Sequence, residues 1–293
     1  MVPSKPRIAV IGGYGGMGRL FAKVFRKDGF EVVITGPRAE KGRAVARELG
    51  VSFEADNRKA ASWADITIIT VPIRKTAEVI KEVAPAVRPG ALLMDLTSIK
   101  KAPCEAMERF SQSSVDVIGM HPVFGPMVDD FRGQNIVLCK VRGGKWFSWV
   151  REYFGGKGAR VTLATPEEHD EFMGVVQGMT HFMLFSAGKT LEELDFDPVS
   201  SKKFSSPVYQ LLLDLIGRIL AQDPALYCEI QTNNKGAAKA RKTFIESSKR
   251  INALLEKGDE EGFIREMRKA AEHFGDTKGA MDRTSRMLGK NED

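Results

Sequence analysis

The glycine-rich segment Gly13-Tyr14-Gly15-Gly16-Met17-Gly18 is the strongest indication of the fold. It follows the apolar run Arg7–Ile11 and opens an amphipathic stretch over residues 16–28. The first glycine of such a motif permits a tight turn, the second lets the backbone approach a pyrophosphate, and the third allows close helix–strand packing. Backbone N–H groups at the start of the helix add an anion site. We therefore predict a dinucleotide-binding loop in which Gly13, Gly15, Gly16, Met17 and Gly18 contact the cofactor.

Short β-branched runs alternate with amphipathic stretches on both sides of this loop. The expected strands are Arg7–Ile11, Glu31–Thr35, Ile66–Val71, Ala91–Leu96, Val115–Met120, Asn135–Cys139 and Ala159–Leu163. Helical patterns lie between them at residues 16–28, 38–48, 73–86, 99–111 and 145–155. Nearly continuous apolar strands that alternate with helices indicate a parallel sheet covered on both faces. We predict an α/β Rossmann-like N-terminal domain with a mainly parallel sheet over residues 1–164.

The character of the chain changes near Thr165, a candidate helix N-cap that precedes Pro166. The segments beyond it read as helices at residues 166–189, 207–222, 224–232, 234–256 and 259–288. The segment 207–222 is apolar almost all round, so we expect it to be buried, either within its domain or between subunits. Residues 165–293 are thus predicted to form an all-α C-terminal domain.

The composition narrows the class of function. Lys and Arg exceed Asp and Glu by a net charge of +6, but the two signs are interspersed and form no basic run. This pattern argues against nucleic acid and suits small anionic ligands. No apolar run reaches the roughly 18 residues of a membrane span, and the N-terminus lacks a signal-peptide pattern. We expect a cytoplasmic protein, and four dispersed histidines without ligand spacing argue against a metal site.

The choice of cofactor depends on the end of the second strand. An NAD site usually carries Asp or Glu there to bind the ribose 2′-hydroxyl. The chain instead reads Thr35-Gly-Pro-Arg38, followed by Lys41. A 2′-phosphate would be well served by Thr35, Arg38 and Lys41, so NADP is favoured over NAD. The alternative is that these cations only solvate the outer face of the next helix.

Ligands of open α/β sheets lie beyond the carboxyl ends of the strands, and two such ends carry unusual residues. One holds Ser98, and the other places His121 in a loop rich in proline and glycine. In the helical region, Gln177 and His181 share a helix face with two glycines, which leave room for a ligand. Arg218 lies within the apolar helix, so we expect its guanidinium to be buried and to need an anion. Asp214, four residues earlier, could be that anion instead of a ligand.

These residues stand in longer motifs that resemble the prephenate dehydrogenase family. The motifs are Gly119-Met-His-Pro-Val-Phe-Gly-Pro126, His169-Asp170, Gln177-Gly-Met-Thr-His181-Phe182, Ser205-Ser-Pro-Val-Tyr209, Gly217-Arg218 and His273-Phe-Gly-Asp276. The resemblance covers essentially the whole chain, and it is greatest to archaeal enzymes and to the dehydrogenase half of the bacterial T-protein. It implies a homodimer formed through the helical domain.

The resemblance also implies a reaction and residue roles. Prephenate would lose a hydroxyl proton to a base and a hydride to NAD(P), then CO₂, to give 4-hydroxyphenylpyruvate for tyrosine biosynthesis. His121 matches the base, and Ser98 matches the serine that the family places by hydrogen bonding near that histidine and the substrate hydroxyl. Arg218 matches the arginine that binds the substrate carboxylate, and His181 a second histidine of the pocket. Gln177 is uncharged where arogenate-preferring relatives tend to carry a carboxylate. His169, in the first turn of its helix, is interpreted as local structure.

Other functions remain open at this stage. Arogenate dehydrogenase would use the same residues. Thr180 and Gln210 stand where the T-protein has arginines, so the electrostatics of substrate capture should differ. Hydroxyacid dehydrogenases of similar plan need a catalytic lysine motif, which neither Lys189 nor Lys202 provides. A sensor that binds NADP without turnover would have no need of a base together with a carboxylate-binding arginine.

Overall fold

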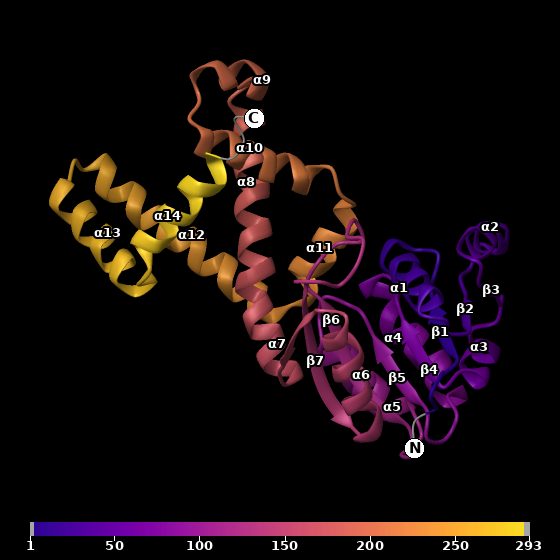
Figure 1. Ribbon diagram of the computed structural model, residues 1–293. Coiled ribbons are helices and arrows are strands. Elements are labelled where there is room, and N and C mark those ends of the chain that lie inside the picture. The colour runs from indigo at the N-terminus through magenta and orange to yellow at the C-terminus, as the bar shows by residue number, and fades with distance from the viewer. Residues whose placement is uncertain (1–2, 290–293) are drawn as a thin grey trace. The chain divides into compact units, whose positions relative to one another are not determined.

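The computed structural model describes residues 3–289, which form two compact units. The first, the sheet unit, runs up to Met173 and also includes Cys228–Gly236. The second, the helical unit, comprises Gly174–Tyr227 and residues 237–289. Two segments placed by sequence in the helical domain, residues 165–173 and 228–236, therefore fold with the sheet (Figure 1).

The sheet has eight strands in the order β3-β2-β1-β4-β5-β6-β7-β8. The strands are β1 (Ile8–Ile11), β2 (Val32–Ile34), β3 (Ser52–Phe53), β4 (Ile66–Ile69), β5 (Leu92–Asp95), β6 (Asp116–Pro122), β7 (Asn135–Arg142) and β8 (Arg160–Leu163). All neighbours pair in parallel except β6 and β7, which are antiparallel. The predicted Rossmann-like fold with a mainly parallel sheet is confirmed. The two-residue strand β3 is too short to show a period in the sequence.

Helices cover both faces of this sheet (Figure 1). One face carries α1 (Gly16–Lys27), α2 (Ala39–Leu49) and α6 (Lys145–Gly156), and the other α3 (Asn57–Trp63), α4 (Ile73–Val83) and α5 (Lys101–Phe110). Alternate residues of β1 serve the two cores, with Ile8 and Val10 packed on the first face and Ala9 and Ile11 on the second. This double burial explains why the strands are apolar throughout.

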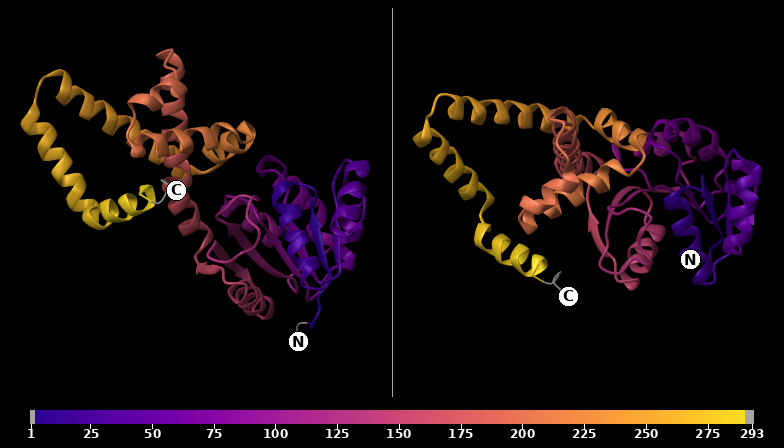
Figure 2. Two further views of the ribbon diagram at one scale, coloured as in Figure 1. Left: turned by 45° about the horizontal axis from the view of Figure 1, so that its top comes forward. Right: turned by 90° about the horizontal axis from the view of Figure 1, so that it is seen from above.

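The remaining helices follow the sheet. They are α7 (Pro166–Met173), a π-helix (Gly174–Met179), α8 (Thr180–Glu193), α9 (Pro198–Ser201), α10 (Pro207–Leu220), α11 (Pro224–Asn233), α12 (Lys235–Glu256), α13 (Glu260–Phe274) and α14 (Thr277–Leu288). The segment 166–189, expected as one helix, contains the π-helix, and 259–288 is interrupted at Gly275, which has φ +80°. Figure 2 shows that the chain turns between α12 and α13, which diverge from that turn as two arms of an open bend.

Of the two alternatives for segment 207–222, the structure does not show burial within its own domain. Helix α10 packs on α8, but Ile216 is its only buried residue. Its large apolar side chains are otherwise exposed at Val208, Leu212, Leu215 and Leu220. Burial between subunits, the other alternative, stays a prediction. Among residues 3–289, no helix has the length and apolarity needed to cross a membrane.

Candidate active site

The glycine loop joins β1 to α1 and has room only for glycine at two key positions. A Cβ on Gly13 would lie 2.7 Å from Cβ of Ile34, and a Cβ on Gly18 would lie 2.7 Å from Cα of Gly13. Helix α1 begins without a side-chain cap and without an acidic residue in its first turn. Its first N–H groups therefore suit an anion, and the loop fits the pyrophosphate of a nicotinamide dinucleotide.

Thr35 lies in a different place from the one expected of a phosphate ligand. Its side chain is fully buried at the end of β2. The hydroxyl donates to Oδ1 of Asn57 at 2.6 Å and accepts from the backbone N–H of Gly12 at 3.4 Å. Because both bonds are made inside the protein, Thr35 supports the glycine loop from beneath.

A basic cluster surrounds Tyr14, a residue of the glycine loop that sequence reasoning did not select. The backbone N–H of Arg38 donates to the Tyr14 hydroxyl at 3.2 Å. The Arg38 guanidinium lies 6.0 Å from the centre of the Tyr14 ring, and the Lys41 ammonium lies 5.3 Å from it. These contacts place both exposed cations beside the loop that would hold the cofactor phosphates.

His121 lies within β6 itself, opposite Val137 of β7, and only 2% of its surface is exposed. Its Nδ1 atom is 2.8 Å from Nε2 of His169, and Nδ1 of His169 is 2.8 Å from Oδ1 of Asp170. The Asp170 carboxylate also accepts backbone N–H bonds from Lys100 at 2.7 Å and Lys101 at 3.1 Å. These contacts connect the strand of the candidate base to the N-terminus of α5.

The protonation states of this group follow from its surroundings. Burial lowers the pKa of His121 well below 6.5, and the nearby His169 and Lys100 act in the same direction. Burial also lowers the pKa of His169, although its hydrogen bond with Asp170 opposes the shift. For Asp170, burial acts to raise the pKa, but the hydrogen bonds from His169 and from two backbone N–H groups outweigh it and the pKa is lowered. The stable state is thus two neutral imidazoles beside a carboxylate.

A buried ion pair lies next to this group. The Lys100 ammonium bonds to Oδ2 of Asp95, and neither side chain has any exposed surface. Oδ2 of Asp95 also accepts the backbone N–H of Thr97 at 2.9 Å and its hydroxyl at 2.5 Å. Ser98 lies half-buried in the loop that follows. Its expected hydrogen bond to His121 stays a prediction. Among the described residues, no cluster of His, Cys, Asp and Glu could hold a metal ion.

The helical unit has a polar cluster of its own. The His181 ring meets the Tyr227 ring edge-on, with centroids 4.6 Å apart, and burial lowers the His181 pKa. Burial raises the pKa of Tyr227, an effect that the charge of Arg218 opposes. Gln177 lies half-buried in the π-helix, a type of helix often found at functional sites. Sequence reasoning missed Tyr227, which no recognised motif contains.

Arg218 is exposed, and the expectation of a buried guanidinium is wrong. Within the described chain, no ion pair joins Arg218 to Asp214, which is exposed as well. The apolar residues around Arg218 suggested burial, but most of them are exposed on α10 in a single copy of the chain. An exposed guanidinium is available to an external carboxylate.

Comparison with known proteins decides the family. The family model described as "Prephenate dehydrogenase, nucleotide-binding domain" matches residues 21–163, and "Prephenate dehydrogenase, dimerization domain" matches residues 165–269. The chain is 30% identical to the T-protein of Haemophilus influenzae over 282 residues, which cover 96% of this chain and 71% of that protein. The chain belongs to the prephenate dehydrogenase family.

Other members of the family extend the comparison. A probable arogenate/prephenate dehydrogenase of Methanocaldococcus jannaschii is 45% identical over 271 residues, which cover 92% of this chain but 61% of that protein. The prephenate dehydrogenase structure from Aquifex aeolicus, in complex with hydroxyphenyl propionate and NAD+, has a TM-score of 0.76 at 21% identity and covers 93% of this chain and 98% of that one. At that identity the structural likeness shows the fold. The resemblance seen in the sequence motifs is thereby confirmed.

Proposed function

We propose that the chain catalyses the oxidative decarboxylation of prephenate to 4-hydroxyphenylpyruvate, with His121 as the base. The observation that carries this proposal is a buried, neutral imidazole held through Nδ1, in a member of the prephenate dehydrogenase family. His121 takes the proton of the ring hydroxyl through Nε2, and a neutral imidazole is competent for this at ordinary pH. A nicotinamide dinucleotide in the glycine loop supplies the hydride acceptor. Aromatisation drives the loss of CO₂.

NADP is the preferred cofactor in this proposal. The supporting feature is the cluster of Tyr14, Arg38 and Lys41 beside the glycine loop, together with the lack of any Asp or Glu in the segment 35–38 after β2. A relative from Schizosaccharomyces pombe, 24% identical, is named a probable prephenate dehydrogenase [NADP(+)]. The double change of Arg38 and Lys41 to alanine should lower kcat/KM with NADP by about tenfold or more, the value of one or two charged hydrogen bonds. The rate with NAD should change little.

Arg218, His181 and Gln177 are proposed to bind the substrate. A guanidinium fork matches a carboxylate in two hydrogen bonds, so Arg218→Ala should raise KM far more than it lowers kcat. Gln177 brings no charge to meet an ammonium group, which favours the keto acid prephenate over the amino acid arogenate. Arogenate remains the second candidate substrate because the Methanocaldococcus jannaschii relative is named for both. The ratio of kcat/KM for the two compounds decides between them.

The decisive experiment mixes the full chain with prephenate or arogenate and each cofactor, and follows reduced nicotinamide by its absorbance. His121→Asn should lower kcat by about 10² to 10⁴, the usual value of a general base, while cofactor affinity is kept. The matched control is His273→Asn, a change at an exposed histidine of α13. Cofactor binding without turnover of either compound would reject the enzyme and favour an NADP-sensing protein.

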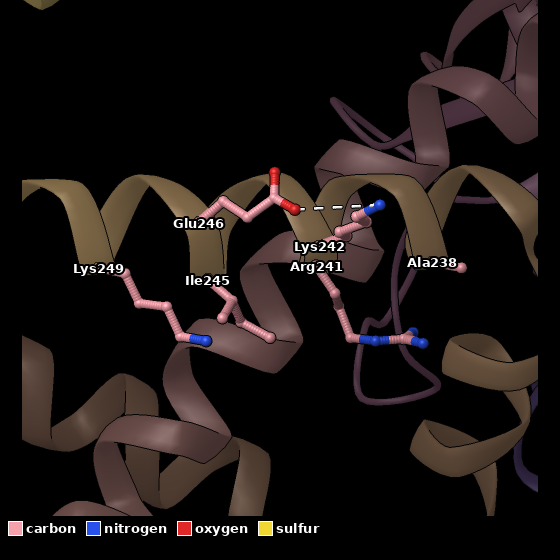
Figure 3. A pocket seen from close by; sticks show the side chains of 6 residues that line it. All are labelled: Ala238, Arg241, Lys242, Ile245, Glu246 and Lys249. Carbon is pink, nitrogen blue, oxygen red and sulfur yellow. Dashed lines mark ion pairs between the residues drawn. The ribbon is translucent and has the colours of Figure 1, made fainter.

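We also propose that the protein is a homodimer formed through the helical unit, in line with the name of the matched dimerization region. Between α12 and α13 lies an open pocket of about 820 Å³, lined by Ile251, Leu254, Phe263 and Met267 among others. Figure 3 shows a second, smaller pocket along α12, where Ile245 points to the same side as Arg241 and Lys249. Apolar side chains left exposed on this scale usually meet a partner. A monomeric mass by sedimentation at micromolar concentration would contradict the proposal.

A further inference from the structure

Two hydrogen bonds link Asp170 to His169 and His169 to His121. Which atom donates in each bond determines which nitrogen of His121 is basic. We propose that His169 and Asp170 are positioning residues that hold His121 with its proton on Nδ1, so that Nε2 is the basic atom. The proposal rests on the proposed role of His121 as the base. Sequence reasoning gave His169 a local structural role, but its side chain is fully buried and bonded to a residue 48 positions away.

The direction starts at Asp170. Its carboxylate accepts the backbone N–H groups of Lys100 and Lys101, which can only donate. It therefore acts as an acceptor toward His169 as well, and Nδ1 of His169 must carry a proton and donate it to Oδ1. Neutral His169 then has its lone pair on Nε2. That lone pair accepts the Nδ1–H of His121 across 2.8 Å. A neutral His121 is left with its lone pair on Nε2.

The same arrangement stabilises His121 after it has reacted. When Nε2 takes the proton of the substrate hydroxyl, the O–H bond breaks, an N–H bond forms and the imidazole becomes a cation. Burial and the charge of Lys100 both oppose that cation. The Asp170 carboxylate acts against them through neutral His169, because electrostatic interactions are stronger in a site that excludes water. The positioning pair thus acts on the reacting state more than on substrate binding.

Two pairs of variants test the role in turnover. Asp170→Asn keeps the shape of the side chain but removes its charge. Its matched control is Asp56→Asn, because the Asp56 carboxylate caps α3 by accepting the N–H groups of Arg58 and Lys59 and does not bond to a histidine. We expect Asp170→Asn to lower kcat by about 10²-fold or more, within the range of acid–base catalysis, with KM nearly unchanged. The control should keep its kcat.

His169 offers a conservative and a disruptive replacement. The amide oxygen of His169→Gln can still accept the Nδ1–H of His121, whereas the side chain of His169→Leu has no atom that can accept it. The glutamine variant should keep at least about ten times the kcat of the leucine variant, since one lost buried hydrogen bond costs about that factor or more. Equal kcat in the two variants, or equal losses for Asp170→Asn and Asp56→Asn, would overturn the positioning role.

A measurement on the unmutated protein tests the proposal without turnover. The chain has four histidines, so ¹⁵N-labelled imidazoles can be assigned with single variants. We expect His121 and His169 both to carry their proton on Nδ1 at neutral pH. A His121 protonated on Nε2 in an enzyme that turns over prephenate would reject the positioning pair alone. The expected tautomers without any turnover would reject the proposed function and leave the geometry of the pair intact.

Discussion

Replacement of Lys100 by methionine should destabilise the sheet unit strongly. Methionine fills much the same volume, so the packing is nearly kept and the change isolates the charge. The Asp95 carboxylate would then stay fully buried with only the two hydrogen bonds from Thr97. Breaking a buried ion pair by removing one partner typically costs about 3–5 kcal/mol. Because Thr97 still donates to the carboxylate, we expect the free energy of unfolding to fall by about 3 kcal/mol.

The assay is urea unfolding followed by circular dichroism at one fixed protein concentration, with Lys100→Met compared with Asp95→Asn and with the double variant. The double variant removes both charges and should recover most of the loss, to within about 1–2 kcal/mol of the original protein. Lys75→Met is the matched control, since it breaks an exposed pair with Glu78 and should cost less than about 1 kcal/mol. A loss for Lys100→Met no larger than that of Lys75→Met would refute the reasoning, and so would strict additivity in the double variant.

Two further predictions concern cofactor binding and pH. Gly18→Ala places a Cβ 2.7 Å from Cα of Gly13 and should weaken cofactor affinity by about tenfold or more, measured by fluorescence titration. The control is Gly155→Ala, where the Cβ has open space. Equal cofactor affinities in the two variants would contradict the close-packing argument. The free energy of unfolding should fall as the pH drops below about 6.5, by up to roughly 1.4 kcal/mol per pH unit for each histidine whose pKa is lowered by folding, because only the unfolded chain then binds the proton. The buried histidines His121 and His169 should contribute most, and the half-buried His181 less, because solvent screens it. Stability that is flat between about pH 7.5 and 5.5 would count against their burial as neutral imidazoles.

Much of the sheet unit could be predicted because its signals are local. Strand β1, the glycine loop and helix α1 follow one another within 20 residues, and the loop needs its glycines for steric reasons that a short motif displays. Strand β3 and helix α3 were missed because segments of two and seven residues show too little periodicity. The interruption of the segment 166–189 by a π-helix was also missed, since its six residues are too few to show a period of their own.

The helical unit shows the opposite limit of sequence reasoning. The apolar letters of α10 identified a helix that needs a partner, but they could not say which one. The structure excludes burial within a single copy and shows Arg218 exposed on that helix. Hydrophobic periodicity reports only that a face avoids water, because the free energy of burial does not depend on which chain supplies the contact.

Sequence patterns alone identified the dinucleotide loop, the family and His121 as the candidate base, since each is carried by short motifs of neighbouring residues. The residues that hold His121 became visible in the folded chain. Its partner His169 is 48 residues away, on a helix that sequence reasoning assigned to the other domain, and Asp170 joins that helix to the start of α5. A hydrogen bond needs two atoms about 3 Å apart in space, whatever their separation in the sequence, so a short sequence motif does not show it. Which ring nitrogen of His121 carries the proton is therefore determined by the folded chain.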